Sequence, residues 1–170
     1  MLKSFFALLA CLPILLSLHA PAAAPPSYAG TWKLVREKSD GLTGGLAGAD
    51  VQLVVKQDAE KIYVEQIVTI RGRRQPSQEL IWRLDGSESS ADVSRPLAGS
   101  MTLKARWLEG LKTLELYSSI SGDDQGKEVA VVTKESWELL QNGKALRISR
   151  TRNAPQGRHS SKLWFEKSEE

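Results

Sequence analysis

TKESWELLQNGKALRISRTR, residues 133–152, holds two runs of alternating polar and apolar residues on either side of Asn142-Gly143. Asn-Gly favours a two-residue β-hairpin loop, and that loop pairs Gln141 with Lys144. Counting outward from this pair brings apolar residues together, with Leu139 opposite Leu146 and Trp137 opposite Ile148. The agreement in character supports the pairing, and the stretch therefore predicts a hairpin with one apolar face.

The same register carries charged residues onto the face of Trp137. Glu135 is predicted to lie opposite Arg150, and Thr133 opposite Arg152, because side chains two residues apart share a face. In the next hairpin, Arg150 is placed opposite Ser161, which also pairs Ile148 with Leu163 and Leu146 with Phe165. A carboxylate and a guanidinium should thus meet on an inner face, either as a structural ion pair or as an anchor for a ligand.

Strand patterns recur along the rest of the chain, separated by short runs of turn residues, as in a β-sandwich or β-barrel. No stretch has a helical period over three turns. The predicted strands are residues 31–35, 51–57, 62–70, 78–84, 88–93, 101–108, 113–120, 128–140, 145–152 and 159–167. Asp85-Gly86 predicts a further hairpin. Short connections imply an all-β, antiparallel up-and-down meander, and closure into a barrel removes exposed edges; two packed sheets are the alternative.

Apolar residues on the alternating faces form the predicted core. It comprises Leu53, Val55, Val64, Leu80, Trp82, Leu103, Trp107, Leu116, Trp137, Leu139, Leu146, Ile148 and Leu163. Each of these residues lies on the apolar face of its strand, so all of them are expected to point inward.

Residues 1–24 differ in character from the rest. Lys3 precedes an apolar run at residues 5–18, and small residues and prolines follow, which is the order found in a secretory signal peptide. One alternative is an N-terminal anchor helix. Another is a lipoprotein, because Leu8-Leu9-Ala10-Cys11 resembles a lipobox in which Cys11 is lipidated. We expect a signal peptide at 1–24, one domain at 25–170, a periplasmic or secreted location, and no transmembrane domain.

The sequence lacks the residues that several classes of function require. Outside residues 1–24 there is no cysteine and one histidine, His159, so neither a disulfide framework nor a histidine- or cysteine-based metal site is predicted. The net charge of +3 is too small to indicate a nucleic-acid partner. No nucleophile, base and orienting group occur in a recognisable arrangement. The expectation is a protein that is not an enzyme and needs no cofactor.

Gly30-Thr31-Trp32 opens the first predicted strand, and KLWFEK at residues 162–167 ends the last. On these motifs the chain resembles the bacterial exported lipocalin-like domain proteins, which have calycin-type β-barrels related to lipocalins and fatty-acid-binding proteins. The resemblance implies a lipocalin-like barrel with a small hydrophobic ligand inside. It also implies that Trp32 packs against an arginine of a late strand, Arg150 or Arg152. The Thr-Asp-Tyr motif of typical lipocalins is absent.

Binding of a small hydrophobic, amphipathic or anionic lipid-like ligand inside the barrel is the predicted function. The predicted site residues are Glu135, Arg150, Arg152, Trp137, Trp107 and Trp82. The alternative is a barrel with a filled core that acts through its surface as an interaction module. Interior polar groups distinguish the two, because a filled core has almost none without a partner, whereas a ligand cavity tolerates a few.

Overall fold

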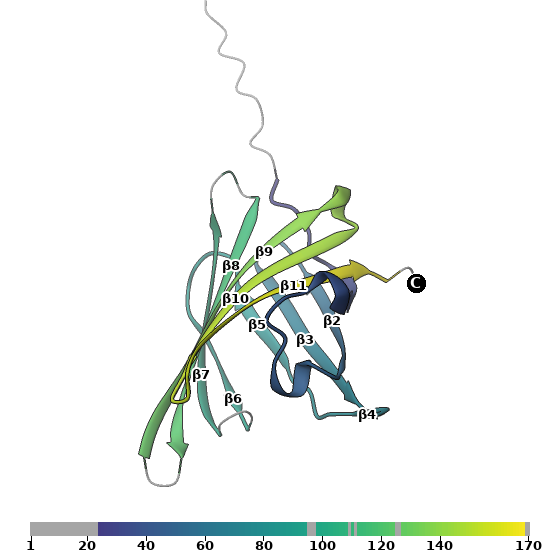
Figure 1. Ribbon diagram of the computed structural model, residues 1–170. Helices are drawn as coiled ribbons and strands as arrows, with labels where there is room; N and C mark the ends of the chain where they lie inside the picture. The colour runs from purple at the N-terminus through teal and green to yellow at the C-terminus, as the bar shows by residue number, and fades with distance from the viewer. Residues whose placement is uncertain (1–23, 95–97, 109, 111, 125–126, 169–170) are drawn as a thin grey trace, which may run out of the picture.

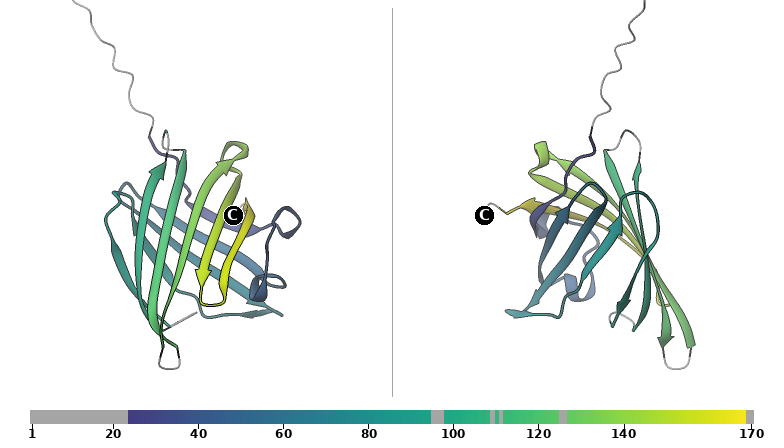
Figure 2. Two further views of the ribbon diagram at one scale, coloured as in Figure 1. Left: turned by 60° about the vertical axis from the view of Figure 1, so that its left-hand side comes forward. Right: turned by 180° about the vertical axis from the view of Figure 1, so that it is seen from behind.

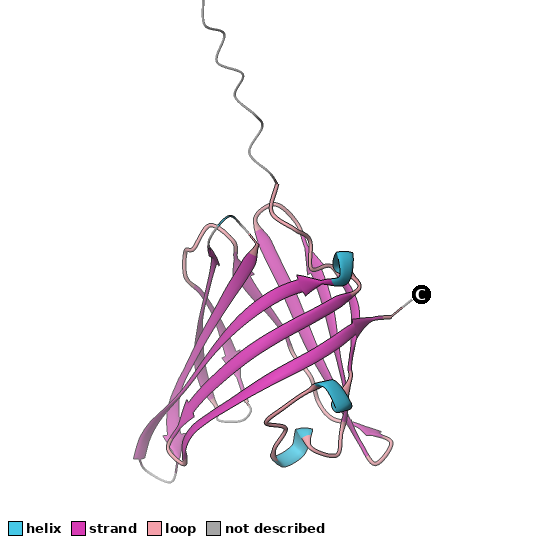
Figure 3. Cartoon of the chain, turned by 45° about the horizontal axis from the view of Figure 1, so that its top comes forward, coloured by secondary structure: helices cyan, strands magenta, loops and turns pink. Residues whose placement is uncertain are grey.

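The computed structural model describes residues 24–94, 98–108, 110, 112–124 and 127–168. The predicted signal peptide and Cys11 lie outside this range, apart from Ala24. The chain forms β1 (Gly30–Leu34), β2 (Asp50–Gln57), β3 (Lys61–Ile70), β4 (Arg73–Arg74), β5 (Glu79–Arg83), β6 (Ser89–Val93), β7 (Gly99–Leu108), β8 (Thr113–Asp124), β9 (Lys127–Leu140), β10 (Ala145–Ala154) and β11 (Gly157–Lys167). Short 3₁₀ turns, η1 (Arg36–Lys38), η2 (Gly44–Leu46) and η4 (Gln141–Gly143), lie at the periphery (Figure 3).

The strands form one antiparallel sheet in the order β4-β3-β2-β1-β11-β10-β9-β8-β7-β6, with β5 also paired to β3. Neighbours in the sheet are neighbours in the chain except where β1 meets β11 and where β5 pairs with β3, so the topology is an up-and-down meander. The sheet curls into a barrel-like shape, in which β2, β3 and β5 face the long strands β7 to β10 (Figures 1 and 2). The all-β fold class is confirmed, and none of the described helices is long and apolar enough to cross a membrane.

All ten predicted strands are present, and the sequence patterns missed only the short β4. The turn at Arg71-Gly72, with φ of 50° and 73°, folds β4 back so that Arg73 pairs with Ile70. The predicted register of residues 133–165 is confirmed: Glu135 lies opposite Arg150, and Arg150 opposite Ser161. The turn between β9 and β10 has positive φ at Gln141, Asn142 and Gly143.

The hairpin predicted at Asp85-Gly86 is wrong. Strand β5 pairs with β3 and β6 pairs with β7, and within the described residues no backbone ladder joins β5 to β6. The Leu84 N–H donates to the carbonyl of Glu60, which holds β5 on β3 beyond its last residue, and the Asp85 side chain accepts from Ser87. The five residues 84–88 therefore form an open connection. We call this break between β5 and β6 the seam.

The core largely matches the prediction. Ten of the thirteen predicted residues are buried, and Leu80, Trp107 and Leu139 are half-buried against them. The sequence patterns did not predict Tyr28, which precedes β1 and is fully buried. Its ring stacks on Trp107 and meets Trp137 edge-on, with centroids 6.1 and 5.8 Å apart. We call this cluster of Tyr28, Trp107 and Trp137 the plugged end of the barrel.

Candidate functional site

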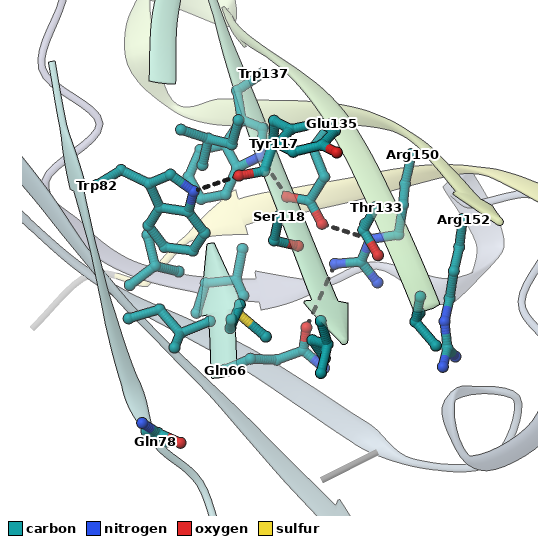
Figure 4. Close-up of a pocket in the computed structure, with 17 residues that line it drawn as sticks. Gln66, Gln78, Trp82, Tyr117, Ser118, Thr133, Glu135, Trp137, Arg150 and Arg152 are labelled. Atoms are coloured by element: carbon teal, nitrogen blue, oxygen red, sulfur yellow. Dashed lines mark hydrogen bonds and ion pairs between the residues drawn. The ribbon is translucent and has the colours of Figure 1, made fainter. Parts of the chain in front are cut away.

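A cavity of about 250 Å³ lies inside the barrel, beyond Trp137 as seen from the plugged end (Figure 4). Strands β3, β5 and β7 to β10 supply most of its lining, and β2 contributes Leu53. Apolar side chains such as Leu80, Met101 and Leu116 form part of the wall, because alternation along each strand turns them inward. Polar side chains form another part. The interior is therefore hollow and amphipathic in this half.

Glu135 and Arg150 form an ion pair on the cavity wall. The Arg150 Nε donates to Glu135 Oε1 at 2.6 Å, and the indole Nε1 of Trp137 donates to Glu135 Oε2 at 2.7 Å. The two charged side chains are only 15% and 17% exposed. Both carboxylate oxygens thus have donors, and the carboxylate fixes the arginine while leaving its terminal nitrogens for other partners.

Gln66 completes this network from the opposite strand β3. Its Oε1 accepts a hydrogen bond from Arg150 Nη2 at 3.4 Å, across the interior of the barrel. The prediction of site residues did not include Gln66. A signal for it existed, because Gln66 is the polar member of an inward-facing run in β3 that also contains Ile62, Val64 and Val68. A lone amide on an apolar face marks a place where the interior is polar.

Arg152 also lines the cavity, opposite Thr133 as predicted. Its side chain is half-buried and extends apart from the Glu135–Arg150 pair (Figure 4). Among the described residues, no acidic group forms a salt bridge with Arg152. The described lining therefore carries two guanidinium groups and one carboxylate, an excess of one positive charge.

The predicted tryptophans separate into two groups. Trp82 and Trp137 line the cavity, and the Nε1 of Trp82 donates to the carbonyl of Tyr117 at 3.1 Å. Trp107 does not line it, because it lies near the end of β7 at the plugged end, stacked on Tyr28. The structure thus brings five of the six predicted site residues together, and their part in ligand binding stays a prediction.

The expected contact between Trp32 and an arginine is wrong. Lys167 lies over the Trp32 ring at 5.3 Å, and the Trp32 Nε1 donates to the carbonyl of Tyr28 at 2.9 Å. Trp32 pairs directly with Lys167, whereas Arg150 pairs with Ser161, six residues earlier on β11. At about 3.3 Å per residue the two sites are about 20 Å apart along the strand.

Three titratable groups outside the cavity, Glu115, Tyr28 and His159, have structural partners. Burial would raise the pKa of Glu115 on the outer face, but hydrogen bonds and charge from Lys134 and Arg106 outweigh it and lower that pKa. Burial raises the pKa of Tyr28 to about 12. The exposed His159 ring contacts the carbonyl of Gly41 at 2.7 Å and holds the β1–β2 connection. Within the described part of the chain, no cluster of three metal-ligating side chains occurs.

Comparisons with known proteins give limited similarity. No protein-family model matches the chain, and no curated protein matches it. Among solved structures, a zebrafish ileal bile acid-binding protein complexed with cholic acid is 11% identical, with a TM-score of 0.46, over 83% of this chain and 98% of that one. A fatty-acid-binding protein from Manduca sexta is 12% identical, with a TM-score of 0.47, over 82% of this chain and 99% of that one.

Proposed function

We propose that this protein is an exported, non-catalytic carrier of a small amphipathic anion, which it binds in the barrel cavity. The observation that carries the proposal is the Glu135–Arg150–Gln66 network on the wall of an otherwise largely apolar cavity. A filled barrel core keeps almost no polar group without a partner, whereas Arg152 lines the same cavity with no salt bridge among the described residues.

The polar groups suit the head of an anion. Arginine presents planar donors that match a carboxylate, and Glu135 orients Arg150 by occupying its Nε. Arg152 adds a second guanidinium within the same cavity. Since the described lining has an excess of one positive charge, one negative charge on the ligand balances it. Apolar contacts with Trp82 and Leu116 then receive the rest of the molecule.

Cavity size limits the ligand. Pockets for drug-sized ligands typically have about 300–1,000 Å³, and this cavity, at about 250 Å³, falls just below that range. A medium-chain carboxylate such as decanoate is therefore a better match than a long-chain lipid. The exported location rests on the signal-peptide pattern of residues 1–24. An anchor through Cys11 is the alternative, and an intact mass that includes diacylglycerol on Cys11 would establish it.

Native mass spectrometry of the protein purified after export tests the proposal. We expect the mass of a chain that lacks residues of the signal peptide. We also expect one small anion to co-purify with it, or one decanoate to bind per chain when decanoate is added. Uncharged decanol, which has the same chain length, serves as the matched ligand and should bind more weakly. A protein that is empty and binds neither ligand acts instead through its surface, and the carrier proposal is then wrong.

A further inference from the structure

The cavity wall formed by β8, β9 and β10 carries a row of three polar side chains. Ser118 of β8 lies opposite Thr133 of β9, and Thr133 lies opposite Arg152 of β10. All three side chains line the cavity (Figure 4). Because side chains two residues apart share a face, this row lies next to the Glu135–Arg150 pair on the same inner face. We call Ser118, Thr133 and Arg152 the polar row.

The side-chain hydrogen bonds of the described cavity lining do not include the polar row. They join Trp82 to Tyr117, Trp137 and Arg150 to Glu135, Arg150 to Gln66, and Gln78 to Asp92. A serine or threonine hydroxyl can both donate and accept a hydrogen bond, and a guanidinium presents five N–H donors. The polar row therefore offers a ligand hydrogen-bonding groups that the described protein residues do not use.

Apolar residues lie on both sides of the two hydroxyls along β8 and β9. Trp137 lies toward the plugged end, and Ile120 lies opposite Val131 in the other direction. Ile120 and Val131 are buried and line the cavity, whereas Ser118 and Thr133 are half-buried between these apolar neighbours. Polar groups placed among apolar ones inside a cavity are typical of a site that fixes the orientation of a ligand.

The spacing of the sheet places these hydroxyls beside the proposed anion site. Arg150 and Arg152 are two residues apart on β10, which is about 6.6 Å along the strand. Thr133 is about 4.8 Å from Arg152, one strand away, and Ser118 is one strand further. In a 3-hydroxy acid the hydroxyl oxygen lies less than about one such spacing from the carboxyl carbon. A carboxylate at the two arginines therefore brings a neighbouring ligand hydroxyl to Thr133.

We infer that the cavity selects carboxylic acids with a hydroxyl close to the carboxyl group, such as 3-hydroxydecanoate, and that Ser118 and Thr133 recognise that hydroxyl. The inference rests on the proposed function, because it takes the anion site as given. The carboxylate lies between Arg150 and Arg152, and the alkyl chain lies against Leu116. A hydroxyl adds a single heavy atom to decanoate, so the cavity of about 250 Å³ accepts both acids.

Isothermal titration calorimetry with three acids of equal chain length tests this selection on the protein purified after export. The acids are decanoate, 3-hydroxydecanoate, with each enantiomer measured separately, and 10-hydroxydecanoate. The better enantiomer of 3-hydroxydecanoate should bind about tenfold more tightly than decanoate, since one or two hydrogen bonds contribute about that factor. The isomer 10-hydroxydecanoate has the same polarity with its hydroxyl at the far end, and it should bind no more tightly than decanoate.

The double variant Ser118→Ala with Thr133→Val removes both hydroxyls. Its Kd values for decanoate and 3-hydroxydecanoate should become equal, and its circular dichroism spectrum checks that it folds. If the double variant does not fold, each single variant should show a reduced preference. The matched control is Ser119→Ala with Thr102→Val, which removes two hydroxyls that lie opposite each other outside the cavity lining. This control should keep the tenfold preference of the parent.

Equal Kd values for decanoate and 3-hydroxydecanoate in the parent would overturn the selection for a hydroxyl, while saturable binding of both acids would leave the carrier proposal intact. A preference that persists without the hydroxyls of Ser118 and Thr133 would overturn their role in recognition. If none of the three acids binds, the carrier proposal is wrong, and the selection inferred from it is wrong as well.

Discussion

The two ends of the barrel share their strands but differ in what fills them. At the plugged end, Tyr28, Trp107 and Trp137 pack against one another, and the Tyr28 hydroxyl donates to the Trp137 carbonyl at 2.8 Å. Beyond Trp137 the interior holds a cavity with Arg150 on its wall. In the β9–β10 ladder the interior changes from apolar to charged within two residues, from the pair Trp137–Ile148 to the pair Glu135–Arg150.

This difference suggests that residues at the plugged end stabilise the fold, whereas residues beside the cavity in the same ladder serve ligand binding. Aromatic residues supply large burial and close one end, so the other half is free to keep open volume and charged groups. If this division is correct, substitutions at the plugged end should change the free energy of unfolding, while equivalent changes beside the cavity should change it little. The predictions below test that contrast.

The largest effect is expected from Trp137→Ala. Trp137 is 1% exposed and contacts Tyr28, so removing its ring should lower the free energy of unfolding by about 3–5 kcal/mol. Urea unfolding followed by circular dichroism measures the change. A loss below about 1 kcal/mol would mean that the filled end contributes little to stability.

A reciprocal exchange of valine and threonine compares the two regions directly. Val55→Thr places a hydroxyl in the filled core, where Val55 is 3% exposed, and should cost about 1–3 kcal/mol. Thr133→Val on the cavity wall should stay within about 0.5 kcal/mol of the parent in the same urea experiment. Equal costs at the two positions would show that the cavity wall is packed as tightly as the core around Val55.

Tyr28→Phe tests the buried hydroxyl. Loss of its bond to the Trp137 carbonyl should cost about 1 kcal/mol at neutral pH. Burial raises the pKa of Tyr28 from 10.0 to about 12, so the folded state holds this proton more tightly. The associated stability is present below pH 10 and is lost as the pH rises toward 12. The parent should therefore lose stability more steeply than Tyr28→Phe across that interval, and parallel curves would contradict a buried hydroxyl.

Local sequence patterns predicted the strands and the β9–β10–β11 register, because alternation and the Asn142-Gly143 turn act between near neighbours. They did not predict the contact of Gln66 with Arg150 or that of Tyr28 with Trp137, which join residues 84 and 109 positions apart. Such contacts depend on how the whole sheet curls. The seam was not predicted for a related reason. The Asp85-Gly86 pattern is local and carries no information about the pairing of β5 with β3.

Titration of tryptophan fluorescence with decanoate, in the parent and in Arg150→Met, tests the central claim most directly. We expect saturable quenching in the parent, and in Arg150→Met a loss of at least about 1.5 kcal/mol of binding free energy, or roughly tenfold in Kd. Leu108→Ala, outside the cavity lining, should bind as the parent does. An unchanged Kd in Arg150→Met, or no saturable binding in the parent, would contradict an anion anchored at Arg150.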